Sequence, residues 1–320
     1  LIQLINTDTL KSLTCMKIKD EPAFANRGLQ LDVAHTFFKA DIIKEYIEAI
    51  SKLKFNQFIW KLADEQTWRI ESKKYPKITE VGTANSAGFY TQDDIKQVLQ
   101  FAKEHFITVI PEIDLTSAVF FDDTTFQYKK NIIDEMGTLF PSGLIQISKP
   151  AFYANEAEAY IKSKGKKVIH IDNASSKDDI VVSFKNITVG INAAKKGNDV
   201  IMAPHNFCSL DNYPDWDDPK LTKSMLYLPI DKVYTFDPLA KIKEEKIKQH
   251  IIGVRANIDT KFIDNENKLS RQVYPRIFAL AECFWTKKAN KSSFKEFSVR
   301  LENIGYPGQI TGKINMVKFK

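Results

Sequence analysis

The chain has 320 residues, 43% of them apolar, and 46 basic against 40 acidic residues give it a formal net charge of +6. This is the composition of a globular chain with a full core, arranged as one large domain or two ordinary ones. The basic residues are mostly lysines spread along the whole length, so we interpret them as a mildly basic surface and expect no nucleic-acid partner. No apolar run approaches the roughly 20 residues that cross a bilayer, and no transmembrane segment is expected.

The start of the chain and its cysteines set further limits. Cys15, Cys208 and Cys283 are too few and too scattered for a disulfide framework or a zinc site, so we predict buried thiols, no metal and no other cofactor. The chain begins without Met and in mid-pattern, so no signal peptide is visible. We expect residues 1–22, a polar stretch, to be the remnant of a preceding small α+β domain, and residues 23–320 to form the main domain.

Short apolar runs alternate with amphipathic helical stretches from residue 29 onward, which is typical of parallel βα architecture. Eight runs with helical connections predict a (β/α)8 barrel of the TIM type. A doubly wound open sheet stays open as an alternative, because one of the runs is weak. The expected strands are residues 29–33, 57–62, 108–113, 144–147, 167–171, 180–184, 199–203 and 251–256, and the main expected helices are residues 40–53, 92–105, 131–139, 155–164, 189–196, 238–250 and 275–284.

Polar side chains occupy the predicted ends of these strands, where a barrel of this type keeps its chemistry. Two aromatic residues nearby, Trp60 and Trp68, fit packing roles better than a binding platform. The polar or rim residues at the strand ends are Asp32, His35, Lys61, Asp64, Glu65, Glu112, Asp114, Gln146, Ser148, Lys149, His170, Asp172, Phe184, Lys185, His205, Arg255, Asn257 and Asp259.

Four motifs, in the same order along the chain, are similar to those of one enzyme family. Residues 27–35 are similar to its opening Arg-Gly-Leu-Met-Leu-Asp-x-Ser-Arg, and residues 58–69 to its Phe-His-Trp-His-Leu-Thr-Asp-Asp-Gln-Gly-Trp-Arg. Residues 88–95 are similar to Gly-Tyr-Tyr-Thr-Gln-Glu-Asp-Ile, and residues 274–282 to Phe-Pro-Arg-x-x-Ala-Leu-Ala-Glu. On these motifs the chain resembles glycoside hydrolase family 20, the β-N-acetylhexosaminidases. The resemblance implies a TIM-type barrel that takes glycans containing N-acetylhexosamine and is secreted or associated with the cell envelope.

The resemblance also implies a particular reaction. In the family the 2-acetamido oxygen of the sugar attacks the anomeric carbon, an Asp orients the acetamide, and an adjacent Glu is the general acid. Both belong to a His-x-Gly-Gly-Asp-Glu segment after the fourth strand, which corresponds here to residues 146–151. The Asp position is Pro150 and the Glu position is Ala151. Neither side chain holds a charge or donates a proton, so the resemblance implies a degenerate site without hexosaminidase activity.

Other family positions that surround the sugar are also replaced. The third-strand His corresponds to Ala118, the sixth-strand Trp to Phe184 and the Tyr of strand seven to Ser209. Residues 170–173 replace Gly-Trp-Asp-Glu, and residues 258–261 replace Leu-Trp-Thr-Glu. Most aromatic faces on which a sugar ring would stack are therefore missing.

Four substrate-binding positions match the family: Arg27, which in the family binds sugar hydroxyls, and three aspartates, Asp64, Asp114 and Asp211. A structural interpretation stays open for each of them. Arg27 pairs with Asp32 at the barrel mouth in that interpretation, and the aspartates orient loops by hydrogen bonding.

Five more residues complete the candidate site. His170 and Asp172 lie two apart on a predicted strand and share a face, which is the arrangement of a new acid–base pair. Tyr213 and Trp216 lie in an Asp-rich loop and are expected to offer exposed aromatic contacts. Asp259 follows the last strand, in the segment where the family has Trp and Glu.

Three functions remain open from the sequence. The first is a degenerate family member that binds a glycan or a partner, and the second is an active glycosidase whose acid has moved, for instance to Glu112, Asp172 or Asp259. The third is a structural module whose mouth is filled. Glu156 and Glu158 are the nearest acidic residues after the gap in the motif, and their helix is expected to present them to solvent.

Overall fold

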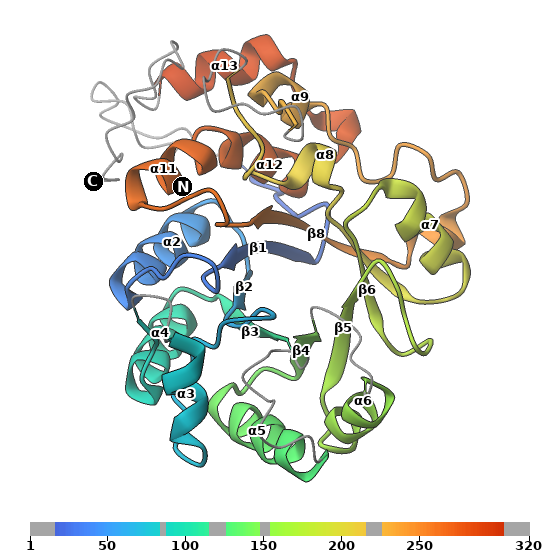
Figure 1. Cartoon of the computed structure of the whole chain (residues 1–320). Coiled ribbons are helices and arrows are strands. Elements are labelled where there is room, and N and C mark those ends of the chain that lie inside the picture. Colours follow the sequence, from blue (N-terminus) through green and yellow to red (C-terminus); the bar gives the residue numbers. More distant parts are fainter. Residues whose placement is uncertain (1–16, 84–87, 115–125, 148–153, 216–225, 304–320) are drawn as a thin grey trace.

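The computed structural model of the chain describes residues 17–83, 88–114, 126–147, 154–215 and 226–303. Eight strands close into one barrel in sequence order (Figure 1), and every neighbouring pair is parallel. The closed barrel confirms the predicted fold, and the open doubly wound alternative is wrong. The strands are β1 (Asn26–Asp32), β2 (Gln57–Lys61), β3 (Thr108–Ile113), β4 (Leu144–Ile147), β5 (Lys167–Ile171), β6 (Ile180–Ser183), β7 (Asp199–Met202) and β8 (Ile251–Ile258).

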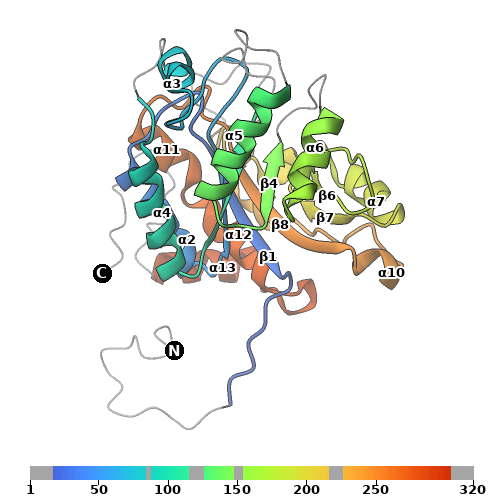
Figure 2. The same ribbon diagram turned by 90° about the horizontal axis from the view of Figure 1, so that it is seen from below.

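Helices surround the barrel, as Figure 1 shows, and Figure 2 gives the same arrangement after a quarter turn. Within the described ranges, none of them is long and apolar enough to cross a membrane. The helices are α2 (Ala40–Lys52), α3 (Pro76–Thr83), α4 (Gln92–Glu104), α5 (Phe126–Leu139), α6 (Ala154–Ser163), α7 (Ile187–Lys195), α8 (His205–Cys208), α9 (Ile230–Tyr234), α10 (Glu245–Lys248), α11 (Glu266–Val273), α12 (Arg276–Trp285), the 3-10 helix η2 (Lys288–Asn290) and α13 (Phe294–Asn303).

One predicted helix, residues 238–250, is wrong. The chain instead turns twice after Asp237, where Ala240 N donates to Asp237 O and Ile242 N donates to Leu239 O, and helix begins only at α10. The Asp237 side chain accepts a hydrogen bond from Leu239 N at 3.0 Å. An aspartate before a proline favours such a local turn over a helical start, because its carboxylate binds the backbone N–H groups that follow it.

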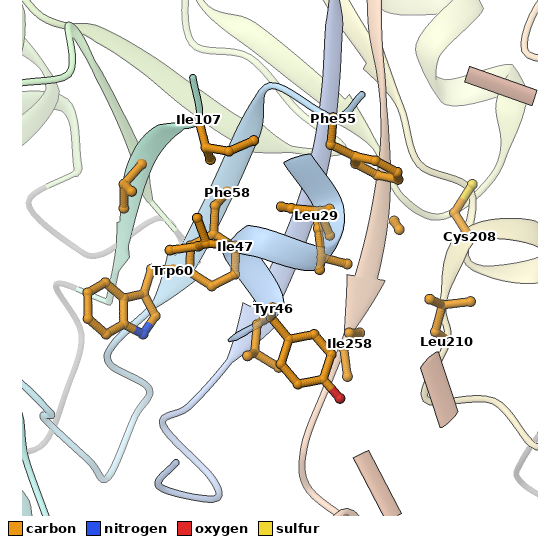
Figure 3. Close-up of a cluster of buried hydrophobic side chains, with 14 of the residues drawn as sticks. Leu29, Tyr46, Ile47, Phe55, Phe58, Trp60, Ile107, Cys208, Leu210 and Ile258 are labelled. Atoms are coloured by element: carbon orange, nitrogen blue, oxygen red, sulfur yellow. The ribbon is translucent and has the colours of Figure 1, made fainter. Parts of the chain in front are cut away.

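The alternation of side chains along the strands divides the core in two. Ile59, Ile110 and Ile169 point into the barrel and form one buried cluster. Leu29 and Phe58 point outward and belong to the large cluster between strands and helices, where Figure 3 draws them beside the α2 side chains. This layering follows from the two-residue period of a strand, because successive side chains lie on opposite faces.

Several packing predictions are confirmed. Trp60 and Trp68 are 0% and 1% exposed, so neither is a binding platform. Cys208 and Cys283 are buried free thiols, and burial raises the pKa of Cys283 to about 11. Cys15 lies outside the described residues.

The chain enters the barrel through residues 17–25, along its base. Asp20 accepts hydrogen bonds from the Trp285 indole at 2.6 Å and from Lys54 at 2.6 Å, and Glu21 pairs with Lys287 at 2.9 Å. Most of the expected remnant at residues 1–22 lies outside the described ranges, so its assignment to a separate domain stays a prediction.

Closure of the barrel between β1 and β8 depends on one glycine. Gly253 lies opposite Asn26 in the ladder, and a Cβ atom built on it would lie 2.6 Å from Asn26 Cβ and 2.8 Å from Asn26 O. Two backbones therefore approach more closely here than any side chain allows, which is one of the uses of glycine within a strand.

We expect Gly253→Ala to lower the free energy of unfolding by about 2 kcal/mol, because the added methyl group must push the two closing strands apart. Urea unfolding followed by circular dichroism measures the change. Gly143→Ala is the matched control, because nothing lies within 4 Å of the added atom, and its effect should stay within about 0.5 kcal/mol. Equal effects in the two variants would contradict this account of closure.

Candidate functional site

A buried carboxylate at the end of β1 organises the carboxyl-terminal mouth of the barrel. Asp32 is 1% exposed and lies 2.5 Å from Lys61 Nζ and 3.1 Å from His35 Nδ1. Its other oxygen accepts a hydrogen bond from Ala34 N at 2.8 Å. Because β1 and β2 are paired with Asp32 opposite Lys61, the two side chains meet inside the barrel.

The three groups hold one another in their charged forms. Burial works against the charge of Asp32, but the hydrogen bonds from His35 and Lys61 outweigh it, and the pKa of Asp32 is lowered. The hydrogen bond to Asp32 raises the pKa of His35, although burial of the ring opposes this. Burial also opposes the charge of Lys61, yet the nearby Asp32 and Glu112 carboxylates raise its pKa. Asp32 is therefore an ionised anchor and a poor proton donor.

Two aspartates lie around His35 at the rim. His35 Nε2 lies 3.7 Å from Asp64 Oδ2, and His35 Nδ1 lies 3.8 Å from Asp259 Oδ1. Asp64 Oδ1 accepts hydrogen bonds from Gln66 N, Thr67 N and the Thr67 hydroxyl. The carboxylate of Asp64 thus shapes its own loop, in agreement with the structural interpretation of this residue.

Asp211 is an acidic group at the mouth whose pKa is raised. Burial, helped by the nearby Asp259 carboxylate, raises the pKa of Asp211 to about 6. Asp259 N donates to Asp211 Oδ1 at 3.4 Å, so the two residues are neighbours on the rim. Asp211 thus combines a raised pKa with a position at the mouth, and both are properties of a general acid.

The layer of the barrel interior directly beneath the rim is polar. Gln30 donates to Glu112 at 2.9 Å, and Arg255 donates to Gln146 at 2.6 Å and to Asn257 at 2.8 Å. Arg255 is 1% exposed, and its burial lowers its pKa to about 10. Glu112, which the sequence offered as a relocated acid, is thus part of a buried network one layer below the mouth.

The structure contradicts both the expected pairing of Arg27 with Asp32 and its expected place at the barrel mouth. Arg27 is the second residue of β1 and donates to Phe24 O, Ala25 O and Lys54 O, with its guanidinium 5.1 Å from the centre of the Trp285 ring. Five residues of strand separate it from Asp32, or about 16 Å, and odd and even positions face opposite sides. Arg27 therefore neither pairs with Asp32 nor reaches the mouth. At the mouth end of the same motif stands His35, where the family pattern has a second Arg.

The predicted pairing of His170 with Asp172 is also wrong. Strand β5 ends at Ile171, and Asp172 adopts a left-handed conformation with φ of 59°, so the strand alternation stops before it. The Asp172 carboxylate accepts hydrogen bonds from Phe184 N and Lys185 N, at 2.7 and 2.9 Å. His170 faces outward and lies 3.2 Å from Glu158, which is 4% exposed and not solvated as expected.

The remaining candidates fall into two groups. Asp114 is buried at 2% exposure after β3, and Tyr213 is buried at 7%, so Tyr213 is not the exposed aromatic residue that was expected. Pro150, Ala151, Ala118 and Trp216 lie outside the described residues. An exposed ring that the sequence analysis missed is Phe262, which is 64% exposed and three residues beyond Asp259. The sequence could have indicated Phe262 as a rim residue, because it closely follows the last predicted strand.

Comparison with known proteins agrees with this architecture. The model of the glycosyl hydrolase family 20 catalytic domain matches residues 24–119 and 146–288. A β-hexosaminidase of Porphyromonas gingivalis is 29% identical, and the alignment covers 90% of this chain and 46% of that protein. A β-hexosaminidase of Vibrio furnissii is 28% identical, with 88% of this chain and 60% of that protein covered.

Solved structures give the same result. The family 20 exo-β-N-acetylglucosaminidase from Vibrio harveyi superposes with a TM-score of 0.80 and 25% identity, over 88% of this chain and 57% of that one. The β-N-acetylhexosaminidase from Bacteroides fragilis gives 0.80 and 25%, over 89% and 70%. The chain thus spans about half of the length of the curated relatives named above.

We expect Lys61→Met to lower the free energy of unfolding by about 3 kcal/mol, because it removes the main countercharge of a buried carboxylate. Urea unfolding at neutral pH measures the loss. Lys287→Met, which breaks the exposed pair with Glu21, is the control and should cost no more than about 1 kcal/mol. A loss in Lys61→Met as small as in this control would mean that the ion pair does not anchor the mouth.

The raised pKa of His35 predicts a pH dependence with a definite sign. A group whose pKa is higher in the folded than in the unfolded chain stabilises the fold fully below the unfolded value, about 6.5, and loses that effect as the pH rises through the folded value. The stability difference between the wild type and His35→Gln should therefore be largest near pH 5 and shrink in alkaline solution. A difference that grows with pH would contradict the charged contact.

Proposed function

Because the chain belongs to glycosyl hydrolase family 20, we propose that it is a hexosaminidase-like barrel that binds N-acetylhexosamine-containing glycans at its mouth without hydrolysing them. The proposal rests on the sequence motifs, which predict that Pro150 and Ala151 occupy the family's Asp-Glu positions. A proline ring and a methyl group neither orient an acetamide by hydrogen bonding nor protonate a leaving oxygen.

The state of the mouth carboxylates supports the loss of activity. Asp32 is ion-paired with Lys61, and the carboxylates of Asp64 and Asp172 accept backbone hydrogen bonds that hold them in place. A glycosidase needs a carboxylic acid that stays protonated beside the scissile oxygen. Asp32 has the opposite setting, because the hydrogen bonds from His35 and Lys61 outweigh its burial and lower its pKa. All three carboxylates hold loops and strand ends in place.

The rim also offers groups that suit a sugar. His35 and Asp259 lie within 3.8 Å of each other, and both are partly exposed. They supply donors and acceptors for sugar hydroxyls, while the exposed ring of Phe262 suits the apolar face of a pyranose. Binding at this rim needs no proton transfer and is compatible with the replaced catalytic positions.

We expect the protein to show no turnover of a chromogenic N-acetylglucosaminide above background between about pH 4 and pH 8, the range in which a perturbed carboxylic acid titrates. Calorimetric titration with an N-acetylglucosamine oligosaccharide should give binding, weakened about threefold to tenfold in Phe262→Ala. Phe106→Ala is the control, since Phe106 is 89% exposed but precedes β3 at the opposite end of the barrel. The absence of both turnover and binding would leave a structural role and refute the proposal.

One observation favours a second candidate, an active glycoside hydrolase with a relocated acid. Burial raises the pKa of Asp211 to about 6, and Asp211 lies beside Asp259, so the mouth holds two neighbouring carboxyl groups, one of them with a raised pKa. This candidate predicts turnover that falls as the pH rises through 6, because the acid must be protonated, and that is lost in Asp211→Asn. Asp264→Asn, on the exposed loop after β8, is the control. Turnover with this profile would replace our first proposal by the second.

A further inference from the structure

A second group of charged side chains lies outside the barrel, between α6 and β5. Glu158 comes from α6, His170 from β5 and Asp179 from the position just before β6. Their exposed fractions are 4%, 7% and 0%. His170 points away from the barrel interior, because its neighbour Ile169 belongs to the inner cluster. The group is therefore separate from the mouth and has no part in the site above.

The Nε2 atom of the His170 imidazole points between two carboxylates. Its Nε2 lies 3.2 Å from Glu158 Oε1 and 3.7 Å from Asp179 Oδ2. Within the part of the chain that the structure describes, this buried nitrogen has no hydrogen-bond partner. One ligand atom from each of the three residues lies within 4.8 Å of the others.

These distances suit a metal ion. Zinc takes imidazole nitrogen and carboxylate oxygen at about 2.1 Å in a tetrahedral arrangement, so neighbouring ligand atoms lie roughly 3.4 Å apart. The two separations at His170, 3.2 and 3.7 Å, lie on either side of that value. We propose that Glu158, His170 and Asp179 form a Zn²⁺ site that joins α6 to the barrel wall, with a fourth position left for solvent.

The surroundings hold both carboxylates in position. Glu158 Oε1 accepts a hydrogen bond from the Ser175 hydroxyl at 3.0 Å. Asp179 Oδ2 accepts hydrogen bonds from Ser175 N at 3.0 Å and Ser176 N at 2.7 Å. Asn198 Nδ2 donates to Asp179 O at 3.1 Å and so fixes the backbone there. Outer contacts of this kind orient metal ligands and tune their affinity.

The charge balance gives a cation a reason to bind. Two buried carboxylates face one ammonium group, Lys162 Nζ, which lies 2.5 Å from Asp179 Oδ1. With a neutral imidazole this leaves one uncompensated negative charge, and such a charge is costly in a buried position. Lys162 follows Glu158 by one helical turn, and its side chain is 32% exposed. It can therefore swing into solvent when a divalent ion takes its place.

The rival explanation is a proton on His170, which would complete a purely ionic cluster of four side chains. The two explanations differ in what Lys162 does. In a metal site the ammonium competes with the ion, so removing it strengthens binding. In an ionic cluster the ammonium is a required member, and removing it creates no metal affinity.

The first experiment measures Zn²⁺ affinity of the metal-free protein by competition with a fluorescent chelator. We expect one Zn²⁺ per chain in the wild type and binding weaker by about a hundredfold or more in His170→Gln, which loses a ligand. His35→Gln is the matched control, because His35 belongs to the other His–carboxylate group, with Asp32 and Asp259, and it should bind Zn²⁺ as the wild type does. Loss of binding in His35→Gln with retention in His170→Gln would overturn the assignment.

Lys162→Met supplies the decisive comparison. Removal of one nearby positive charge should tighten Zn²⁺ binding by about tenfold. Absence of stoichiometric binding in both the wild type and Lys162→Met overturns the proposal in favour of the ionic cluster. If His170→Gln does not fold, as judged by circular dichroism, Glu158→Gln serves as the ligand variant. X-ray absorption of the zinc-loaded wild type must show nitrogen and oxygen neighbours, and a sulfur neighbour would place the ion at a cysteine and refute the site.

Discussion

The contact between Asp32 and Lys61 is the interaction on which the mouth of this barrel depends. It joins the ends of β1 and β2, and the same carboxylate binds His35 and the backbone of Ala34. The loop after β1 is then joined to the segment after β8, because Thr36 donates two hydrogen bonds to Thr260. A buried ion pair of this kind is costly to break, since one unpaired charge would remain. The geometry of the rim is consequently fixed from β8 through β1 to β2.

This arrangement has a chemical consequence. A carboxylate that anchors loops must be ionised, whereas the acid of a glycosidase must be protonated until it acts. Asp32 has taken the first role, Asp64 holds its own loop by hydrogen bonds, and burial raises the pKa of Asp211. The carboxylate of Asp32 therefore serves the structure of the rim, and the raised pKa of Asp211 is the basis of the second candidate function.

The sequence predicted much of the fold and less of the site. The strand bounds at 108–113, 144–147 and 167–171 agree with the structure, because short buried runs between turn signals have clear ends. The aspartates and His35 were correctly expected near strand ends. An error arose where the backbone conformation of one residue changed the direction of its side chain. Asp172 has a left-handed conformation, which ends the strand alternation that was expected to place it beside His170.

The periodicity of the sequence by itself determined the (β/α)8 barrel, because strand alternation and helical period depend only on neighbouring residues. The order of the four motifs determined the resemblance to family 20. They also led to the prediction that Pro150 and Ala151 stand at the family's catalytic positions, which lie outside the described residues. Only the tertiary structure decided which carboxylates are charged and which face the mouth, since desolvation depends on what packs around a group. Glu158 illustrates this: its helix allowed a solvated face, and the packing of α6 on β5 buried it against His170.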